Sequence, residues 1–509
     1  MSTSTTDRSS TKRRGILILA VVVTALVTFG LTALLINILQ RQTEARQPYA
    51  QVVEITESTD DPAEWGKNFP AQYESYLKTS EMEGTKYAGS HAVEQEPTEL
   101  DPRTIVATSR LEEDPRLKDM WAGYPFATDY RHARGHAYML EDQRLTKRVT
   151  EFNQPGACLN CHASTVTVMN DLGNGDMMAG FHEMNKRPYL EITQMAEHPV
   201  SCLDCHDPET MALRITRPGL ITGLAALKAS EGIENYDVNR DATAQEMRSF
   251  VCAQCHVEYY FAGDEKTLTF PWTQGLEIED IVAHYDSYDF VDWTHATTGA
   301  TMLKAQHPEF DVWSQGVHAS AGVSCADCHM PYVREGARKV TDHWLRSPLL
   351  DASASCGVCH TDDADTMIQR VYTIQDRYVA ERDQTFDALV GLIRDLEAAQ
   401  TNGTPEDRIA LGREYQRLGS FYLDYVYSEN SNGFHAPQYI MRILGDSRNF
   451  SRMGQLALQG MSREDIERQF EGTTIPYGGE EPGHANVVNP GLVDSGAVMK
   501  KVLESRASG

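Results

Sequence analysis

The stretch that decides the organisation of this chain is Cys158-Leu159-Asn160-Cys161-His162, which has the form Cys-x-x-Cys-His. This form is typical of covalent c-type haem attachment. The two thiols add to the vinyl groups of a haem, and the histidine becomes an axial ligand of its iron. The form recurs at four further places, namely Cys202–His206, Cys252–His256, Cys325–His329 and Cys356–His360.

All ten cysteines of the chain belong to these five motifs, so none is left over. They are Cys158, Cys161, Cys202, Cys205, Cys252, Cys255, Cys325, Cys328, Cys356 and Cys359. A disulfide framework has no need of a histidine after every second cysteine, and neither has a zinc ribbon. A thioredoxin-like redox pair normally occurs once. The pattern therefore predicts five covalently bound haems, with clustered zinc sites as the alternative.

The composition narrows the class of protein further. A net charge of -27 over 509 residues argues against nucleic-acid binding. Five haems would supply apolar plates that replace part of a side-chain core. We therefore expect a mainly α protein with a haem-threaded core, few short strands and long C-terminal helices. An anionic substrate would need a local positive patch in so acidic a chain.

The N-terminal segment predicts export across a membrane. Lys12, Arg13 and Arg14 precede Gly15–Leu39, which carries no charged residue and is long enough to cross a bilayer as a helix. A removable signal peptide usually has a shorter apolar region and small residues at its cleavage site. The sequence favours an uncleaved anchor over a removed signal peptide. Either way, the rest of the chain lies outside and the basic residues stay inside.

Composition divides the remainder of the chain into regions. We expect a cytoplasmic N-terminus at 1–14, a transmembrane or signal segment at 15–39, a linker at 40–60, a pentahaem catalytic region at 61–363, a long-helix region at 364–470 and an irregular tail at 471–509. Gly219–Gly232 predicts a short helix within the motif region.

The long-helix region shows apolar residues at helical spacing. One run includes Phe386, Leu389 and Ile393, and Asn402-Gly403 ends it. Thr404-Pro405 predicts a helix start with proline at the first helical position. A third helix is expected from Gln438 to about Ala457. These helices are either ordinary core or a dimer interface.

Three further stretches carry chemical groups near the motifs. Glu258, Tyr259 and Tyr260 follow His256 after one residue, Val257. Lys304, Gln306 and His307 form a second group, and Arg148 lies upstream of Cys158. A helix end, a surface turn and a surface arginine are the alternative interpretations. Only five of the 17 histidines close a motif, so further axial ligands are in ample supply, but spacing does not identify them.

The order of the motifs resembles that of the pentahaem cytochrome c nitrite reductase family. The resemblance rests on CAQCHVEYYF at 252–261, KAQHPE at 304–309, QGVH before the fourth motif, TDHWLRSP before the fifth and GFHAPQ near the end. It covers residues 60 to about 460. It implies a first haem that is the active site and four haems with two histidine ligands each, which relay electrons to it.

Residue by residue, the resemblance also implies the second axial ligands. His343 would face His206, His136 would face His256, His318 would face His329, and His435 would face His360. Arg148, Tyr259 and His307 would line the open face of the first haem. A structural calcium would be held by the Glu258 carboxylate, the Gln306 side-chain oxygen and the carbonyl groups of Tyr259 and Lys304, an all-oxygen set that suits a hard cation.

One position departs from the pattern of the family. Most members have lysine where this chain has His162, so the first motif usually ends in lysine. A proximal imidazole is a different donor, so the potential and affinity of the haem should shift. If another histidine capped this haem as well, all five haems would be relays and the protein would be an electron conduit.

The expected activity is the six-electron reduction of nitrite to ammonium. Arg148 and His307 would bind the oxygens of nitrite, His307 would donate protons because imidazole titrates near neutral pH, and Lys304 with the calcium would add positive potential. A related reductase acting on hydroxylamine or sulfite is an alternative. The resemblance further implies a membrane multihaem quinol dehydrogenase as electron donor and a homodimer formed through the C-terminal helices.

Overall fold

The computed structural model describes residues 7–45, 51–87, 89 and 91–472. Contacts divide the chain into two units, one made of residues 1–52 and 332–341 and the other of 53–331 and 342–509. Most of the expected tail at 471–509 lies outside the described residues. The other expected region boundaries remain predictions.

The first unit consists of the N-terminal helix and one hairpin. Helix α1 spans Asp7–Ala45, and its segment Arg14–Leu39 is long and apolar enough to cross a membrane, with none of that segment buried. A removable signal sequence passes the same test, so length and composition do not separate the two. The hairpin pairs β7 (Tyr332–Glu335) with β8 (Arg338–Thr341) and turns at Gly336, which has a positive φ of 59° that favours glycine.

The second unit is mainly helical, as expected, and its strands are few and short. Three antiparallel pairs join β1 (Ala92–Glu94) to β2 (Ile105–Ala107), β3 (Tyr260–Ala262) to β4 (Thr267–Thr269), and β5 (Trp293–Thr294) to β6 (Thr301–Met302).

Short helices fill the motif region, where the chain turns often. They are α2 (Pro62–Asn68), α3 (Pro70–Leu77), α4 (Arg110–Glu113), α5 (Arg116–Met120), α6 (Met139–Leu145), α7 (Lys147–Thr150), α8 (Val166–Leu172), α9 (Met177–Lys186), α10 (Tyr189–Ile192), α11 (Pro218–Ser230), α12 (Val238–Asp241), α13 (Ala244–Ala253), α14 (Ile278–Ser287), α15 (Glu309–Ser314), α16 (Val317–Ser320), α17 (Cys325–His329) and α18 (Ala352–Ser355). Helix α11 is the short helix expected between Gly219 and Gly232.

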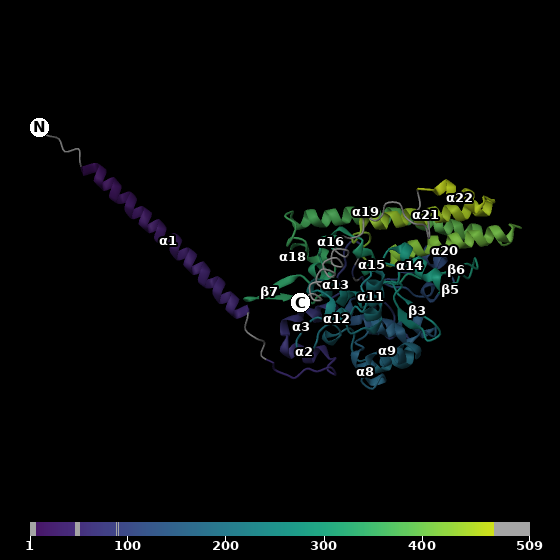
Figure 1. Ribbon diagram of the computed structural model, residues 1–509, viewed down its shortest axis with the longest axis horizontal. Helices are drawn as coiled ribbons and strands as arrows, with labels where there is room; N and C mark the ends of the chain where they lie inside the picture. The colour runs from purple at the N-terminus through teal and green to yellow at the C-terminus, as the bar shows by residue number, and fades with distance from the viewer. Residues whose placement is uncertain (1–6, 46–50, 88, 90, 473–509) are drawn as a thin grey trace. The chain divides into compact units, whose positions relative to one another are not determined.

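Four helices end the described chain, namely α19 (Ala364–Ala399), α20 (Glu406–Ser428), α21 (Pro437–Gln459) and α22 (Arg463–Phe470). Figure 1 shows α19, α20 and α21 lying along one side of this unit. Asp363 caps the start of α19, and Gly460, with φ of 97°, ends α21 in the left-handed conformation. Helix α20 begins at Glu406, so Pro405 is the residue before the helix and not, as the sequence had predicted, its first residue.

The long helices pack closely because small residues lie where they meet. The Ser447 hydroxyl on α21 donates to the carbonyl of Gly419 on α20, with 2.6 Å between the oxygens. A Cβ at Gly454 would lie 2.7 Å from the side chain of Leu392 on α19. Buried Phe386, Tyr425 and others make one core cluster with these helices. A second cluster surrounds the first and third motifs, and a smaller one contains Leu203 of the second motif.

Candidate functional site

The first motif forms a short helix with 3₁₀ geometry, Gly156–Cys161, that ends at His162. The Nδ1 atom of His162 lies 3.2 Å from the carbonyl oxygen of Met139, to which only a protonated nitrogen can donate. This contact leaves Nε2 as the atom free to bind a metal, which is the usual arrangement for an imidazole ligand. Met139 is the first residue of α6, so the position of α6 orients the His162 ring.

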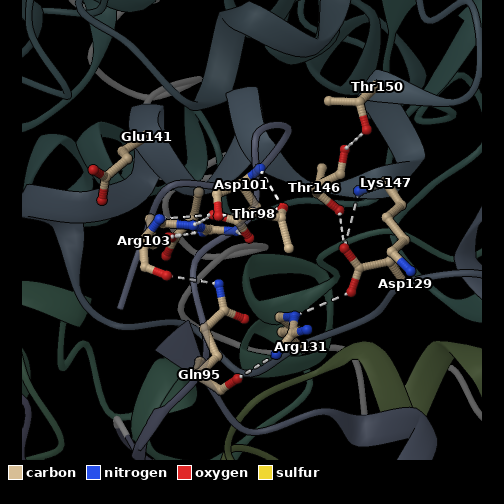
Figure 2. A network of polar contacts seen from close by, with 12 residues as sticks. Gln95, Thr98, Asp101, Arg103, Asp129, Arg131, Glu141, Thr146, Lys147 and Thr150 are labelled. Atoms are coloured by element: carbon tan, nitrogen blue, oxygen red, sulfur yellow. Dashed lines mark hydrogen bonds and ion pairs between the residues drawn. The ribbon is translucent and has the colours of Figure 1, made fainter. Parts of the chain in front are cut away.

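A polar network holds α6 and α7 beside this motif (Figure 2). Arg103 pairs with Asp101 at 2.6 Å and with Asp142 of α6 at 2.7 Å. Asp129 accepts hydrogen bonds from the Thr146 hydroxyl at 2.9 Å and from the Lys147 backbone N–H at 3.0 Å. The second pair of contacts fixes the start of α7, the helix that carries Arg148.

Arg148 is half-buried. Its guanidinium carbon lies 4.3 Å from the centre of the Phe126 ring and 5.7 Å from that of the Tyr130 ring. No carboxylate pairs with it among the described residues. Its charge acts on the first motif, because it lowers the pKa of His162, for which burial is the larger cause. A half-buried arginine without an anionic partner is available to bind an anion.

His307 and Tyr259 come from later stretches and reach the same region. Burial lowers the pKa of His307 to about 4, with His256 and His162 contributing. The Nδ1 atom of His307 is buried and has no hydrogen-bond partner in the described structure. Burial raises the pKa of Tyr259 well above its ordinary value, and Cys161 and Cys158 raise it further. Both side chains therefore lie within electrostatic range of the first motif.

The low pKa of His307 corrects one expectation. An imidazole that titrates near neutral pH was predicted, whereas this ring is neutral at pH 7 because it is removed from water. It still carries one N–H that can donate. An anion bound beside it would raise its pKa, since a negative charge favours the protonated ring.

Lys304 requires a second correction. Its ammonium group lies 2.9 Å from Asp424, and both side chains are 1% exposed. Because the charge of Lys304 is compensated within this pair, its side chain adds little net positive potential to the site. The surface-turn alternative is wrong for this stretch, since Lys304 and Gln306 are both buried.

Glu258 is fully buried and lacks a cationic side chain within ion-pair distance in the described structure. Its carboxylate accepts from the Tyr285 hydroxyl at 2.8 Å and from the Gln306 backbone N–H at 2.7 Å. Burial raises its pKa well above the ordinary value. A buried carboxylate is costly without a positive partner, so the donor set fits a cation held by Glu258 and its neighbours.

Four motif histidines each face another histidine ring. An imidazole nitrogen lies about 2 Å from a metal it binds, so two rings on opposite faces of one iron have centroids roughly 6 Å apart. The centroid distances are 6.3 Å for His206 and His343, 6.4 Å for His136 and His256, 6.3 Å for His318 and His360, and 6.4 Å for His329 and His435. This spacing leaves room for one iron between each pair.

Two of these pairs differ from the expectation. His318 faces His360 rather than His329, and His435 faces His329 rather than His360. The ring of His318 packs against that of Phe434, with 5.7 Å between their centres, and Phe434 is the residue before His435. His318 and His435 therefore lie close together, and each faces a different motif histidine. The implied pairing of these two was wrong, although the set of histidines is the same.

Spacing by itself does not identify a ligand pair. His91 and His132 also lie 6.2 Å apart, and no cysteine motif accompanies them. His256 has a second ring neighbour in His307, at 6.5 Å. His162 differs from the other four motif histidines because no aromatic ring contacts it among the described residues.

The motifs themselves lie close together in space. No cysteine forms a disulfide. A hydrogen bond with Cys255 lowers the pKa of Cys161, and a hydrogen bond with Cys252 lowers the pKa of Cys325 to about 7. The first motif therefore touches the third, and the third touches the fourth.

Three residues near these groups were missed by sequence reasoning. Tyr124 is half-buried, and burial raises its pKa well above the ordinary value. Glu309 lies 3.6 Å from Nδ1 of His256, and Glu429 lies 2.6 Å from Nδ1 of His435. Glu309 is the last residue of the quoted KAQHPE stretch, which was its only signal, and Tyr124 and Glu429 had none.

Comparison with known proteins adds an independent finding. Residues 61–493 match the family model described as cytochrome c552. The cytochrome c-552 of Bacteroides fragilis (strain YCH46) is 34% identical over 440 residues, which is 85% of this chain and 83% of that protein. The cytochrome c nitrite reductase subunit NrfA of Nitratidesulfovibrio vulgaris (strain Hildenborough) is 35% identical over 420 residues, 75% of each chain.

A solved structure shows the same fold. The cytochrome c nitrite reductase catalytic subunit from Desulfovibrio desulfuricans ATCC 27774, described with two calcium sites, superposes with a TM-score of 0.69 and 30% identity. The match covers 84% of this chain and 90% of that one.

Proposed function

Because this chain belongs to the cytochrome c552 family, we propose that it reduces nitrite to ammonium at a haem bound to Cys158, Cys161 and His162. Four further haems on the other motifs would pass electrons to it. The haem iron would supply the position where nitrite binds and the electrons that reduce it. Two of the similar proteins are nitrite reductases, while the relative from Bacteroides fragilis is named only cytochrome c-552.

One observation carries the proposal. Four motif histidines each face a second histidine across a gap that fits an iron, while His162 faces none in the described structure. An electron-transfer haem usually has strong ligands on both faces, whereas a catalytic haem keeps one face open. The open face belongs to the motif that Arg148, Tyr259 and His307 approach.

Arg148 would bind and orient the anion. A guanidinium stays charged at every relevant pH and presents several N–H groups in one plane, which suits the two oxygens of nitrite. Since it has no carboxylate partner in the described structure, no ion pair must break when nitrite enters. As the N–O bonds weaken, the same donors stabilise the negative charge that develops on oxygen.

His307 and Tyr259 would supply protons and hydrogen bonds. The neutral ring of His307 donates one N–H to a substrate oxygen, and the anion raises its pKa so that it can take up and pass on a proton. The high pKa of Tyr259 keeps its hydroxyl protonated and available as a donor. Both groups come from outside the motif, so they could act on the substrate while His162 would serve as the protein ligand of the iron.

A calcium ion would complete the site. The Glu258 carboxylate, the Gln306 side-chain oxygen and the carbonyls of Tyr259 and Lys304 would hold it. The ion would offset the buried charge of Glu258 and fix Tyr259 and His307 through the residues next to them. With Lys304 neutralised by Asp424, this ion and Arg148 would provide the positive potential that attracts an anion.

The setting of the protein follows from the N-terminal helix and from the relatives. The catalytic unit would work on the outer face of the cytoplasmic membrane, in the periplasm, anchored by Gly15–Leu39. Its electron donor would be a membrane multihaem quinol dehydrogenase. Two copies would associate through the C-terminal helices.

Turnover measurements test the proposal directly. The purified holoprotein with a chemically reduced donor is expected to consume nitrite and release ammonium in equal amounts. Arg148→Gln should raise KM and lower kcat, while Lys147→Gln, which removes the same charge from an exposed neighbour on α7, should leave both unchanged. Release of no ammonium, with faster turnover of hydroxylamine or sulfite, would assign the site to those substrates. No turnover of any of them would favour an electron conduit.

A further inference from the structure

The motif histidines and the histidines opposite them differ in the group that contacts the Nδ1 atom of the ring. Nδ1 of His162, His206 and His329 each lies beside a backbone carbonyl, at 3.2, 3.0 and 3.1 Å from Met139, Met211 and Arg346 respectively. A carbonyl is a neutral acceptor that fixes the ring and its tautomer. His435 is different, because its Nδ1 faces a carboxylate.

The carboxylate is that of Glu429, the residue after α20. Its Oε1 lies 2.6 Å from Nδ1 of His435, and its side chain is 0% exposed. The oxygen is not aligned with the N–H direction of the ring, and Nδ1 has no aligned partner elsewhere in the described structure. The contact is therefore a close charge contact made by a carboxylate that is fully buried, while the His435 side chain is 22% exposed.

Ser431 holds the carboxylate in place. Its backbone N–H donates to Oε1 at 3.0 Å and its hydroxyl donates to Oε2 at 2.7 Å. The same hydroxyl accepts from the backbone N–H of His435 at 2.9 Å. The turn 429–435 thus carries both the ligand and the charge behind it, and it fixes the distance between them.

We propose that Glu429 lowers the reduction potential of the fourth haem, the one between His329 and His435. This inference rests on the proposed haems. The negative charge of a carboxylate beside Nδ1 makes the imidazole a stronger donor to the iron, even without an aligned hydrogen bond. A stronger donor stabilises ferric over ferrous iron, so the potential falls.

A second carboxylate, that of Glu309, lies near a histidine of another relay haem. Glu309 lies 3.6 Å from Nδ1 of His256 at the third haem, a longer contact, and Asn430 donates a hydrogen bond to its other oxygen. Its effect should act in the same direction on a different haem and be smaller. Residues 429 and 430 would then act on two consecutive relay haems.

Potentials of the holoprotein, titrated optically without nitrite, test this. Glu429→Gln keeps the shape of the side chain and removes its charge. It should raise the potential of one haem by at least about 59 mV, which is a tenfold change in the equilibrium constant of a one-electron reduction. Ser431→Ala keeps the charge of Glu429 but removes the hydroxyl that holds its carboxylate in place. The haem potential should therefore also rise, but by less than in Glu429→Gln. Glu83→Gln is the control, because Glu83 pairs at 2.9 Å with Arg346, beside the opposite ligand of the same haem, and touches no histidine.

The outcomes separate this inference from the proposed function. Five attached haems by mass with potentials unmoved in Glu429→Gln and Ser431→Ala would overturn the role of Glu429 and leave nitrite reduction standing. The expected shift in a protein that does not reduce nitrite would support the role of Glu429 and overturn the proposed function. Fewer than five haems in the unmodified protein would overturn both.

Discussion

His162 is the residue on which the proposed function depends most. By sequence it is one of five equivalent histidines, each closing the same motif. Among the described residues, no second histidine ring faces its own, and Arg148, Tyr259 and His307 lie near it. The motif alone predicts haem attachment, and the residues around the motif are the reason for proposing that this haem is the catalytic one.

His307 provides the test at the residue scale. His307→Ala should reduce nitrite turnover by roughly 10²-fold, because a positioned acid–base group contributes about that much. The haems should remain attached, since His307 is not assigned to an iron. His182→Ala, which removes an exposed imidazole, is the matched control. Steady-state ammonium release measures both, and near-normal turnover of His307→Ala would remove the proton-donor role.

The resemblance implied the set of histidines that face one another in the structure, and two of the four pairs agree with it. His318 and His435 were each implied by a specific motif, yet their partners are exchanged in the structure. Pairing depends on how α16 and the turn after α20 pack, with His318 against Phe434, and no local pattern encodes that contact. The pKa of His307 was missed for a similar reason, since burial is a property of the fold.

At the scale of elements, the long helices were the most predictable part. Apolar residues at helical spacing located α19, and proline and glycine signals bounded α20 and α21 to within a few residues. The short helices of the motif region were not predictable in detail, because they are held by tertiary contacts such as those of Asp129 with α7 (Figure 2). Their own sequences show little periodicity.

Helix α14 offers a pH-dependent test. Burial raises the pKa of Asp280 to about 6, and the carboxylates of Glu277 and Glu279 raise it further. The folded state therefore holds a proton between about pH 4 and 6 that the unfolded state lacks, so stability falls as pH rises through this window. Asp280→Asn, which removes the buried charge, should raise the unfolding midpoint at pH 8 by about 2 °C, and much less at pH 4.

Circular dichroism melts at the two pH values measure this effect. Asp264→Asn, in the exposed turn between β3 and β4, removes the same charge and should not change the midpoint at either pH. Equal stabilisation by Asp280→Asn at pH 4 and pH 8 would show that the charge of Asp280 is not the cause.

For the whole molecule, the N-terminal helix predicts where the protein works. The full chain should sediment with membranes and resist a high-salt wash, because α1 exposes a long apolar segment. A variant that replaces residues 1–45 with a cleavable signal peptide should release an active soluble protein. Fractionation with mass measurement of the mature N-terminus checks both. A full chain that is cleaved and soluble would make the helix a signal peptide instead of an anchor.

The ligation state of the first haem tests the central claim most directly. Low-temperature electron paramagnetic resonance of the oxidised protein should show one high-spin ferric haem that changes when nitrite or another small ligand is added, together with low-spin signals from the relay haems. Only low-spin signals, unchanged by added ligand, would contradict the account, because all five irons would then be closed and the protein could only carry electrons.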